Sequence, residues 1–540
     1  MIKEFASIQW AEAWQAEAFW PRDEVHFPRA LSPLGASIVP ALEYDGIADA
    51  AEDLALPVRI LARELAGFVY NTTVRRGATD AEQEALERRH AAVMAEQIVR
   101  LPERWQRDYE PELEENNRRL LAFDLPAVGD NALVGHLHEA LDLLRRHWKL
   151  HFLIVLPVFA AGGALVRSYE ALFGREDERA PYRLLQGFPN RTIEADQELW
   201  ELAQRTSSFP SVAGALADGV PALQKLRLLQ GGEEFVTALR GYLARYGRRI
   251  TAADDLFDPT WDENSGFLLR AIGGYLSGGG DSPEERRQLQ SHAREEEVAH
   301  LVGGLPEAAT RTQFLTVLQR AQAIWPLRET HTHLIDQPSF AILRRIFLEF
   351  GARLAARGVF SEREDTFMLS RAEAEKALAE HTSLVGLISE RRGAYQEHLA
   401  GLPPPFIGTS PTESAPPPDP ELIKFFGRPP EPEIDRSVLN GIAASPGVTQ
   451  GVVRVVLTLE DIDAVQPDDV LVCPSTTPPW TPLFGLVSAL VTDAGGLLSH
   501  GAIVAREYGL PAVTGTRMAT RRLRSGQRVE VDGNRGVIRI

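Results

Sequence analysis

The sequence predicts a multidomain protein in which a large all-α region precedes a small C-terminal α/β domain. The chain has 540 residues, more than one hydrophobic core usually serves, so two to four domains are expected. Up to about residue 400, apolar residues recur three and four positions apart with few β-branched runs, which indicates helices. After that point, short Val- and Leu-rich runs are bounded by Gly, Pro and Asp, which is typical of strands.

The helical period is clearest in three windows, residues 79–105, 220–246 and 341–354. One helix start is well marked. Ser282 is a good N-cap, and Pro283 fits the first helical position because its missing amide hydrogen is not needed there.

The most apolar stretch, residues 152–166, is 15 residues long and is interrupted by Pro157 and by Gly162-Gly163. A membrane-spanning helix needs about 20 such residues, so we expect a buried helix pair or a kinked core helix here. The first residues of the chain carry acids and no apolar segment, which does not fit a secretory signal. We therefore expect a cytoplasmic protein.

A proline-rich segment separates the two predicted regions. Residues 403–432 hold 11 of the 36 prolines in the chain, which excludes a long helix or a central strand because proline lacks an amide donor. The segment is either a mobile tether of polyproline character or a static strap on the surface. We expect a helical substrate-binding domain over 1–402, a linker over 403–435 and an α/β domain over 436–540.

The α/β domain is predicted from short strands around one clear helix. The helix is expected at residues 502–508, and the strands are expected at 451–457, 470–473, 489–492, 528–531 and 536–540.

Net charge and cysteine content exclude several classes of function. With 57 basic and 75 acidic residues, the formal net charge is −18, which makes a general nucleic-acid binder or a protein docked on an anionic membrane a poor fit. The single cysteine, Cys473, excludes an intrachain disulfide and a multi-thiolate zinc site within one chain.

The most specific motif is TDAGGLLSHGAIVAREYGLPAV, residues 492–513. It has the order strand, glycine turn, histidine, helix. Gly495 and Gly496 permit a tight turn with exposed amides, and Ser499 and His500 then stand at the start of the helix. A helix N-terminus favours a bound anion.

A neutral imidazole at such a place is suited to accept and pass on a phosphoryl group. His500 would be the nucleophile, Ser499 could add a hydroxyl donor, and Arg506 could reach a phosphate only if another element folds over it. The alternative from spacing alone is that His500 merely caps the helix.

The segment resembles the phosphohistidine domain of the phosphoenolpyruvate-utilising enzymes, among them phosphoenolpyruvate synthase, rifampicin phosphotransferase and phenylphosphate synthase. The likeness covers residues 439–540, and the run 470–484 also looks like a family signature. The residues that carry it are Gly495-Gly496, Ser499-His500, Ala505-Arg506-Glu507 and Gly509-Leu510-Pro511. The resemblance implies that His500 is the phosphorylated carrier.

The helical region resembles, more weakly, the substrate-binding region of rifampicin and phenol phosphotransferases, over 30–37, 246–261, 327–337 and 357–369. Such enzymes load the histidine from ATP with an ATP-grasp domain. We find neither that domain nor a phosphoenolpyruvate-binding barrel, which would need about 250 residues. The resemblance therefore implies a separate ATP-grasp subunit, where ATP and Mg²⁺ would bind.

The best candidate for the acceptor site is the run from Arg328 to Asp336. His331 is a sensible general base, since imidazole titrates near neutral pH. Arg328 could neutralise phosphate charge, Glu329 could orient the acceptor or the histidine, and Asp336 could contact the substrate. Alternatively, the run is a solvated helix turn or an adventitious metal site.

Several other side chains could line the acceptor pocket, although residues with such spacing more often pack in the core or lie on the surface. They are Trp20, His26, His147, Trp148, His151 and Phe152. The predicted function is transfer of a phosphoryl group to a small hydroxylated acceptor, a phenol such as cresol. The alternatives are an antibiotic phosphotransferase and a regulatory phosphohistidine protein.

Overall fold

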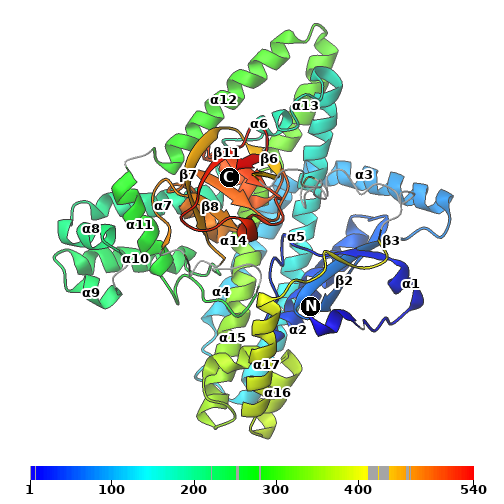
Figure 1. The fold of residues 1–540 in the computed structure, drawn as a ribbon. Helices are drawn as coiled ribbons and strands as arrows, with labels where there is room; N and C mark the ends of the chain where they lie inside the picture. The colour runs from blue at the N-terminus through cyan, green and yellow to red at the C-terminus, as the bar shows by residue number, and fades with distance from the viewer. Residues whose placement is uncertain are drawn as a thin grey trace. The chain divides into compact units, whose positions relative to one another are not determined.

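The computed structural model describes residues 2–6, 8–219, 222–250, 255–278, 281–410, 424, 437–457, 461 and 464–540 (Figure 1). The chain forms two compact units. Unit 1 comprises Met1–Pro157, Ala253–Asp258 and His331–Pro417, and unit 2 comprises Val158–Ala252, Pro259–Thr330 and Pro418–Ile540. The predicted fold class is confirmed, because the chain is mainly helical with a C-terminal α/β sheet region.

Unit 1 is built mostly from helices. They are α1 (Ala13–Glu17), α2 (Pro33–Asp53), α3 (Asp80–Arg104), α4 (Glu110–Ala122), the first part of α5 (Asp130–Phe173), the end of α14 (Leu327–Leu334), α15 (Asp336–Ala356), α16 (Arg371–Glu380) and α17 (Val385–Ala400). Short 3-10 turns lie at η1 (Lys3–Ala6) and η3 (Arg363–Met368), and η2 (Trp105–Tyr109) is a π-helical turn between α3 and α4.

Unit 1 also contains a β-hairpin that the helical periodicity did not predict. Strands β2 (Val58–Leu65) and β3 (Phe68–Arg75) pair antiparallel around Ala66 and Gly67, which both have positive φ, 56° and 80°. A two-residue turn of this kind matches the twist of the two strands. The β2 sequence, VRILAREL, is rich in good helix formers, so its strand structure comes from its pairing with β3.

The start of the expected linker belongs to unit 1. Strand β4 (Phe406–Gly408) pairs antiparallel with β1 (Phe19–Pro21), so residues 406–408 are part of a two-stranded sheet. The rest of the predicted linker, 411–423 and 425–435, lies outside the described residues.

The apolar run at 152–166 lies within one continuous 44-residue helix, α5, which passes through Pro157. Of the two expected arrangements, the helix pair is not formed, and the apolar run is part of a single helix. Among the described residues, α5 is the helix that is long and apolar enough to cross a membrane by length and composition. Of its most apolar window, 61% is buried inside the protein, as is common for a core helix.

The helical part of unit 2 shares a hydrophobic cluster with the C-terminal α/β region. Besides the end of α5 and the start of α14, its helices are α6 (Ala180–Arg183), α7 (Arg191–Thr206), α8 (Pro210–Ala217), α9 (Leu223–Arg227), α10 (Gly232–Tyr246), α11 (Gly266–Gly278), α12 (Pro283–Gly304) and α13 (Ala308–Ile324). Helix α12 begins as predicted, since the Ser282 side chain accepts a hydrogen bond from the Glu285 amide.

The C-terminal sheet of unit 2 has eight strands in the order β5-β12-β11-β7-β8-β9-β10-β6. Strands β7 to β10 run parallel, and the outer strands pair antiparallel. The strands are β5 (Val438–Asn440), β6 (Ile442–Ser445), β7 (Val448–Val455), β8 (Val470–Cys473), β9 (Ala489–Thr492), β10 (Ala512–Thr514), β11 (Arg528–Asp532) and β12 (Val537–Arg539). The remaining helical elements are η5 (Pro478–Trp480), α19 (Thr481–Phe484), α20 (His500–Glu507) and α21 (Ala519–Arg522).

Both faces of the central strands are buried. In β8, Val470 and Val472 belong to one hydrophobic cluster, and Leu471 and Cys473 belong to the other, as alternation along a strand requires. Cys473 is fully buried, and this burial raises the pKa of its thiol. The second cluster joins the sheet to α7, α10 and α11.

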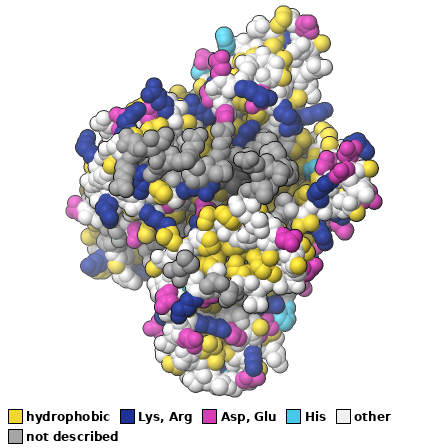
Figure 2. Space-filling view, turned by 45° about the vertical axis from the view of Figure 1, so that its right-hand side comes forward, with side chains coloured by type: hydrophobic (Ala, Val, Ile, Leu, Met, Phe, Trp, Pro, Cys, Tyr) yellow, Lys and Arg dark blue, Asp and Glu magenta, His cyan; other side chains and the backbone are white. Residues whose placement is uncertain are grey.

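The surface carries mixed charge. On the face seen in Figure 2, acidic and basic side chains are interspersed among the described residues.

Candidate functional site

The predicted carrier, His500, is the first residue of α20, directly after the glycine turn that follows β9. Gly495 has φ of 105°, a backbone conformation that glycine adopts without strain. Ser499 is the N-cap in extended conformation, yet its hydroxyl donates to the Gly496 carbonyl at 2.8 Å and caps no amide of the first turn. Within the described chain, the amide N–H groups of His500, Gly501 and Ala502 have no hydrogen-bond acceptor.

Glu329 fixes the orientation of the His500 ring. Its Oε2 lies 2.9 Å from Nδ1 of His500, and both side chains are nearly buried. A carboxylate accepts here, so we assign the ring hydrogen to Nδ1 and the lone pair to Nε2. Nε2 lies 3.4 Å from the hydroxyl oxygen of Thr481. Nε2 is therefore the ring nitrogen that can act as a nucleophile.

Arg328, the residue before Glu329, holds the loop that precedes His500. Its guanidinium donates to the Leu498 carbonyl and lies over the Phe159 ring, 5.2 Å from the ring centroid. Burial lowers the pKa of Arg328 to about 10, and the neighbouring Glu329 opposes that shift. The side chain therefore stays charged at neutral pH and places a positive charge beside the loop.

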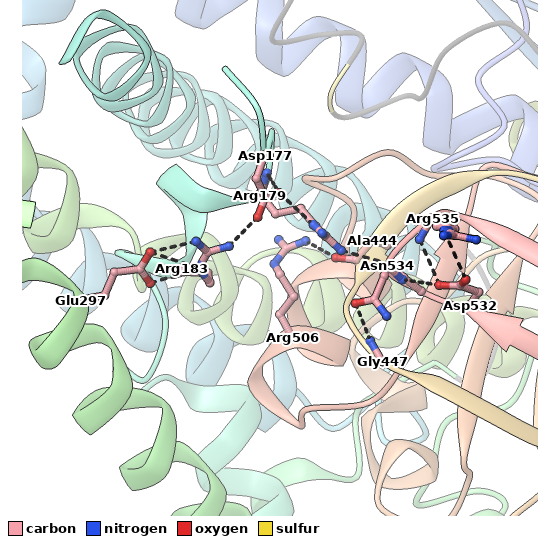
Figure 3. Close-up of polar contacts among 11 residues, drawn as sticks. Asp177, Arg179, Arg183, Glu297, Ala444, Gly447, Arg506, Asp532, Asn534 and Arg535 are labelled. Atoms are coloured by element: carbon pink, nitrogen blue, oxygen red, sulfur yellow. Dashed lines mark hydrogen bonds and ion pairs between the residues drawn. The ribbon is translucent and has the colours of Figure 1, made fainter. Parts of the chain in front are cut away.

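Arg506, in α20, also holds a carbonyl of this loop. Its guanidinium donates to the carbonyl oxygens of Ala444 and Leu497 at 2.9 and 2.8 Å, the first of which is drawn in Figure 3. Burial also lowers its pKa to about 10. Arg328 and Arg506 thus hold two successive carbonyls of the loop, and a phosphate contact of Arg506 stays a prediction.

Figure 3 also shows how the neighbouring helical segment contacts this domain. Arg179 donates to the Gly533 carbonyl at 3.1 Å and pairs with Asp177. Arg183 bridges Asp177 and Glu297. These contacts connect the turn before α6 to the loop between β11 and β12.

Unit 1 brings together three of the predicted acceptor-site residues. Nδ1 of His151 lies 3.0 Å from Oδ1 of Asp336 and 3.1 Å from Nε2 of His331. Burial opposes ionisation of Asp336, but the adjacent His151 and then His331 hold the pKa of this carboxyl below its usual value. Because the three ligand atoms lie within 4.8 Å of one another, the cluster could relay a proton or accept a divalent cation.

Aromatic side chains surround His151. Its ring centroid lies 4.8 Å from that of Phe152 and 4.9 Å from that of Trp148, and Phe340 packs against Trp148 at 6.1 Å. Two of the predicted pocket residues, Trp148 and Phe152, therefore lie beside the cluster.

The other predicted pocket residues have different surroundings. His147 is fully buried, and burial lowers its pKa to about 4, so it is a neutral core residue beside Asn116. Trp20 donates to the Gln15 carbonyl and packs against Trp10 and Trp14. His26 contacts Asp23 and contributes to the lowered pKa of Asp336.

Hydroxyl side chains that were not predicted from the sequence approach the start of α20. Thr481 faces Nε2 of His500, and Thr476 lies against Gly501. The only sequence signal was the run 470–484, to which no role could be assigned, because isolated threonines carry no characteristic spacing.

Two family comparisons cover this site. Residues 465–536 match the mobile domain of PEP-utilising enzymes, and residues 151–329 match the fourth domain of rifampicin phosphotransferase. The chain resembles rifampicin phosphotransferase. Both partners of the contact between Glu329 and His500 fall within residues that these families match.

Individual relatives extend the likeness. Rifampicin phosphotransferase of Streptomyces sviceus is 33% identical over 358 residues, covering 65% of this chain and 40% of that protein. An uncharacterised phosphotransferase of Bacillus subtilis is 30% identical over 536 residues, covering 97% and 62%. Chondramide synthase of Chondromyces crocatus is 32% identical over 568 residues, covering 98% and 14%. The chain spans less than two thirds of the length of each of these relatives.

Proposed function

We propose that this chain is a phosphotransferase that carries a phosphoryl group on Nε2 of His500 and delivers it to a small hydroxylated acceptor. The observation that carries the proposal is the contact of Glu329 with Nδ1 of His500 at 2.9 Å. That contact leaves Nε2 as the nucleophile at a helix N-terminus whose amides can stabilise phosphoryl oxygens.

In the first transfer, a bond between a phosphorus of ATP and its bridging oxygen breaks, a bond from that phosphorus to Nε2 forms, and the rest of the nucleotide leaves with the bridging oxygen. An ATP-grasp module outside these 540 residues would supply the ATP. That this module is a separate subunit remains our prediction. ATP and Mg²⁺ belong to that module in this proposal, and no residue of this chain is assigned to them.

In the second transfer, the bond between phosphorus and Nε2 breaks and a bond from phosphorus to the acceptor oxygen forms. The hydroxyl proton of the acceptor goes to the His151–His331 pair, and Asp336 stabilises the resulting positive charge. Nδ1 of His151 already faces His331 and Asp336. Nε2 of His151 is thus the nitrogen that we assign as the proton acceptor, with His331, the base predicted from sequence, as its partner.

We propose a phenol as the acceptor, because aromatic rings surround His151. Trp148 and Phe152 offer flat apolar surface, which suits a single ring such as that of cresol. A larger antibiotic acceptor is the second candidate, since residues 151–329 match a domain of rifampicin phosphotransferase.

The test is reconstitution of both transfers with the full chain. The chain and an ATP-grasp protein encoded beside it are incubated with ATP labelled on both the β- and the γ-phosphorus, together with a panel of phenols or rifampicin. We expect label on the protein, loss of that label in His500→Ala, and labelled aryl phosphate from the phenols.

Each other result has a defined meaning. Undiminished labelling or turnover by His500→Ala would refute the carrier role. Label on His500 that passes to rifampicin alone would select the antibiotic reading, and label that passes to no acceptor would select a regulatory protein.

A further inference from the structure

The loop between β8 and α19 contains a buried hydroxyl group that makes no hydrogen bond to the described residues. Thr476 is 7% exposed, and its Oγ1 has no hydrogen-bond partner among the described residues. A buried polar atom without a partner costs free energy, so native structures rarely keep one without a reason.

This hydroxyl lies at the N-terminus of α20. A Cβ atom built on Gly501, the second residue of the helix, would lie 2.4 Å from Oγ1 of Thr476. The hydroxyl is therefore in direct contact with the first turn of α20, where three amide N–H groups lack an acceptor. A side chain at position 501 would take the space beside it.

A second hydroxyl, on the first residue of α19, faces His500 itself. Thr481 is fully buried, and its Oγ1 lies 3.4 Å from Nε2 of His500, the atom that would bear the phosphoryl group. Thr481 thus lies at the place that a group bound to Nε2 would occupy, and Thr476 lies against the next residue of the same helix turn.

We propose that Thr476, Thr481 and the first-turn amides of α20 form the binding site for the phosphoryl group on His500. The inference rests on the proposed function, and its ligand is a tetrahedral oxyanion attached through nitrogen. A dianionic phosphoryl group has three acceptor oxygens, and in a buried site each needs donors. The unused hydroxyl of Thr476 is a donor kept for the loaded state.

Two of the residues first expected to bind the phosphate, Ser499 and Arg506, make other contacts. The Ser499 hydroxyl donates to Gly496, and the Arg506 guanidinium donates to the carbonyls of Ala444 and Leu497. They shape the loop, whereas the threonine hydroxyls are available to an anion.

The test loads the full chain with phosphoramidate, a small donor that phosphorylates histidine without a partner protein. Phosphohistidine formation is followed by ³¹P NMR. Thr476→Val has nearly the same shape but no donor, so we expect loading to slow by about 10- to 100-fold, the equivalent of one hydrogen bond to a charged group. Thr476→Ser should load at close to the wild-type rate.

A matched control separates this effect from the loss of any buried hydroxyl. Thr366, in η3 of unit 1, is also fully buried with an unpartnered Oγ1, so Thr366→Val should load normally. Thr476→Val should keep or raise the melting temperature of the unloaded protein, because its hydroxyl has no partner there. If Thr476→Val does not fold, the loading rate of Thr481→Val is measured in its place, and the same slowing is expected.

The outcomes also distinguish this inference from the proposed function. If the wild-type protein forms no phosphohistidine at position 500, the proposed function fails. If it does, and Thr476→Val loads as fast as wild type and Thr366→Val, the threonine site is wrong while the carrier role stands.

Discussion

At the scale of single residues, the reactivity of the site depends on which ring nitrogen of His500 is free. Glu329 settles this by accepting from Nδ1, and Arg328, its neighbour in α14, holds the Leu498 carbonyl of the same loop. Two adjacent residues of one helix therefore position both the histidine and its loop.

Removal of the Glu329 charge should slow loading without unfolding the protein. In Glu329→Gln the amide oxygen can still accept from Nδ1, but the negative charge that offsets the positive charge arising on the ring as Nε2 attacks phosphorus is lost. We expect phosphorylation by phosphoramidate to slow by about 10²-fold, in the range of other groups that act through a catalytic histidine. Glu329→Ala should be slower still. Equal rates for wild type and Glu329→Gln would contradict this role, and Glu295→Gln, an exposed helix position, is the control.

The sequence could identify His500, since a glycine pair and a helix start leave a strong local pattern. It could not bring His151 to His331, because these residues are 180 positions apart and the contact depends on tertiary packing. The same holds for Thr476, whose importance comes only from its contact with Gly501.

Glu507, at the end of α20, should make stability depend on pH. It is buried and accepts from the Gly187 amide at 2.9 Å, and burial raises its pKa from 4.5 to about 7. The folded state then binds the proton more tightly than the unfolded state, so stability falls as the pH rises from about 4.5 to 7 and levels off above that.

The variant Glu507→Gln cannot titrate, so it should lack this loss, which amounts to about 3 kcal/mol for such a shift. Melting temperatures of variant and wild type are measured from pH 5 to pH 8. We expect the difference between them to grow in favour of the variant as the pH rises, and a constant difference would show that Glu507 does not titrate in this range.

At the scale of elements, the long helix α5 is shaped by where its glycines lie. A Cβ on Gly162 would lie 2.8 Å from the Trp325 ring, whereas a Cβ on Gly135 would meet no atom within 4 Å. Close packing against Trp325 therefore requires glycine at position 162. No such contact requires glycine at position 135, where it makes the helix less stable than alanine would.

The two alanine variants should consequently have opposite effects. Gly162→Ala should destabilise the protein by about 1–3 kcal/mol through overpacking, despite the better helix propensity of alanine. Gly135→Ala should stabilise it by up to about 1 kcal/mol. Chemical denaturation of both variants measures this, and a stabilising Gly162→Ala would show that Trp325 moves aside freely.

Periodicity indicated three helical windows, one C-terminal helix and five strands, although the window 220–246 holds two helices, α9 and α10, and the prediction failed where pairing decides the structure. The composition of β2, with Leu, Ala, Arg and Glu, favours a helix. The segment is nevertheless a strand, because it pairs with β3 across a two-residue turn. In the same way, proline composition marked residues 403–435 as a linker, and only the pairing of β4 with β1 shows that residues 406–408 belong to unit 1.

At the scale of the whole molecule, the α/β domain is attached to the helices of unit 2 through a buried carboxylate. Asp196, in α7, accepts from the hydroxyls of Tyr275 and Tyr508, and burial raises its pKa. If His500 serves two sites, as we propose, the α/β domain must break this contact to move, so the strength of the contact would set how often the domain is released.

Tyr508→Phe should weaken this attachment. We expect faster hydrogen exchange in α7 and α20 and faster loading by the ATP-grasp partner, since less energy is needed for release. Tyr242→Phe, which removes a buried hydroxyl that has no partner in the described chain, is the control. Unchanged exchange in Tyr508→Phe would mean that apolar packing alone holds the domain.

The burial of Cys473 makes such motion directly observable. The only cysteine of the chain lies fully enclosed in β8, and its thiol is held in the unreactive protonated form. Two surface cysteines, one on each side of residues 411–436, could therefore be coupled to fluorescent dyes without first removing a native thiol. Single-molecule energy transfer between the dyes would then report, in real time, the distance between the α/β domain and the helical region.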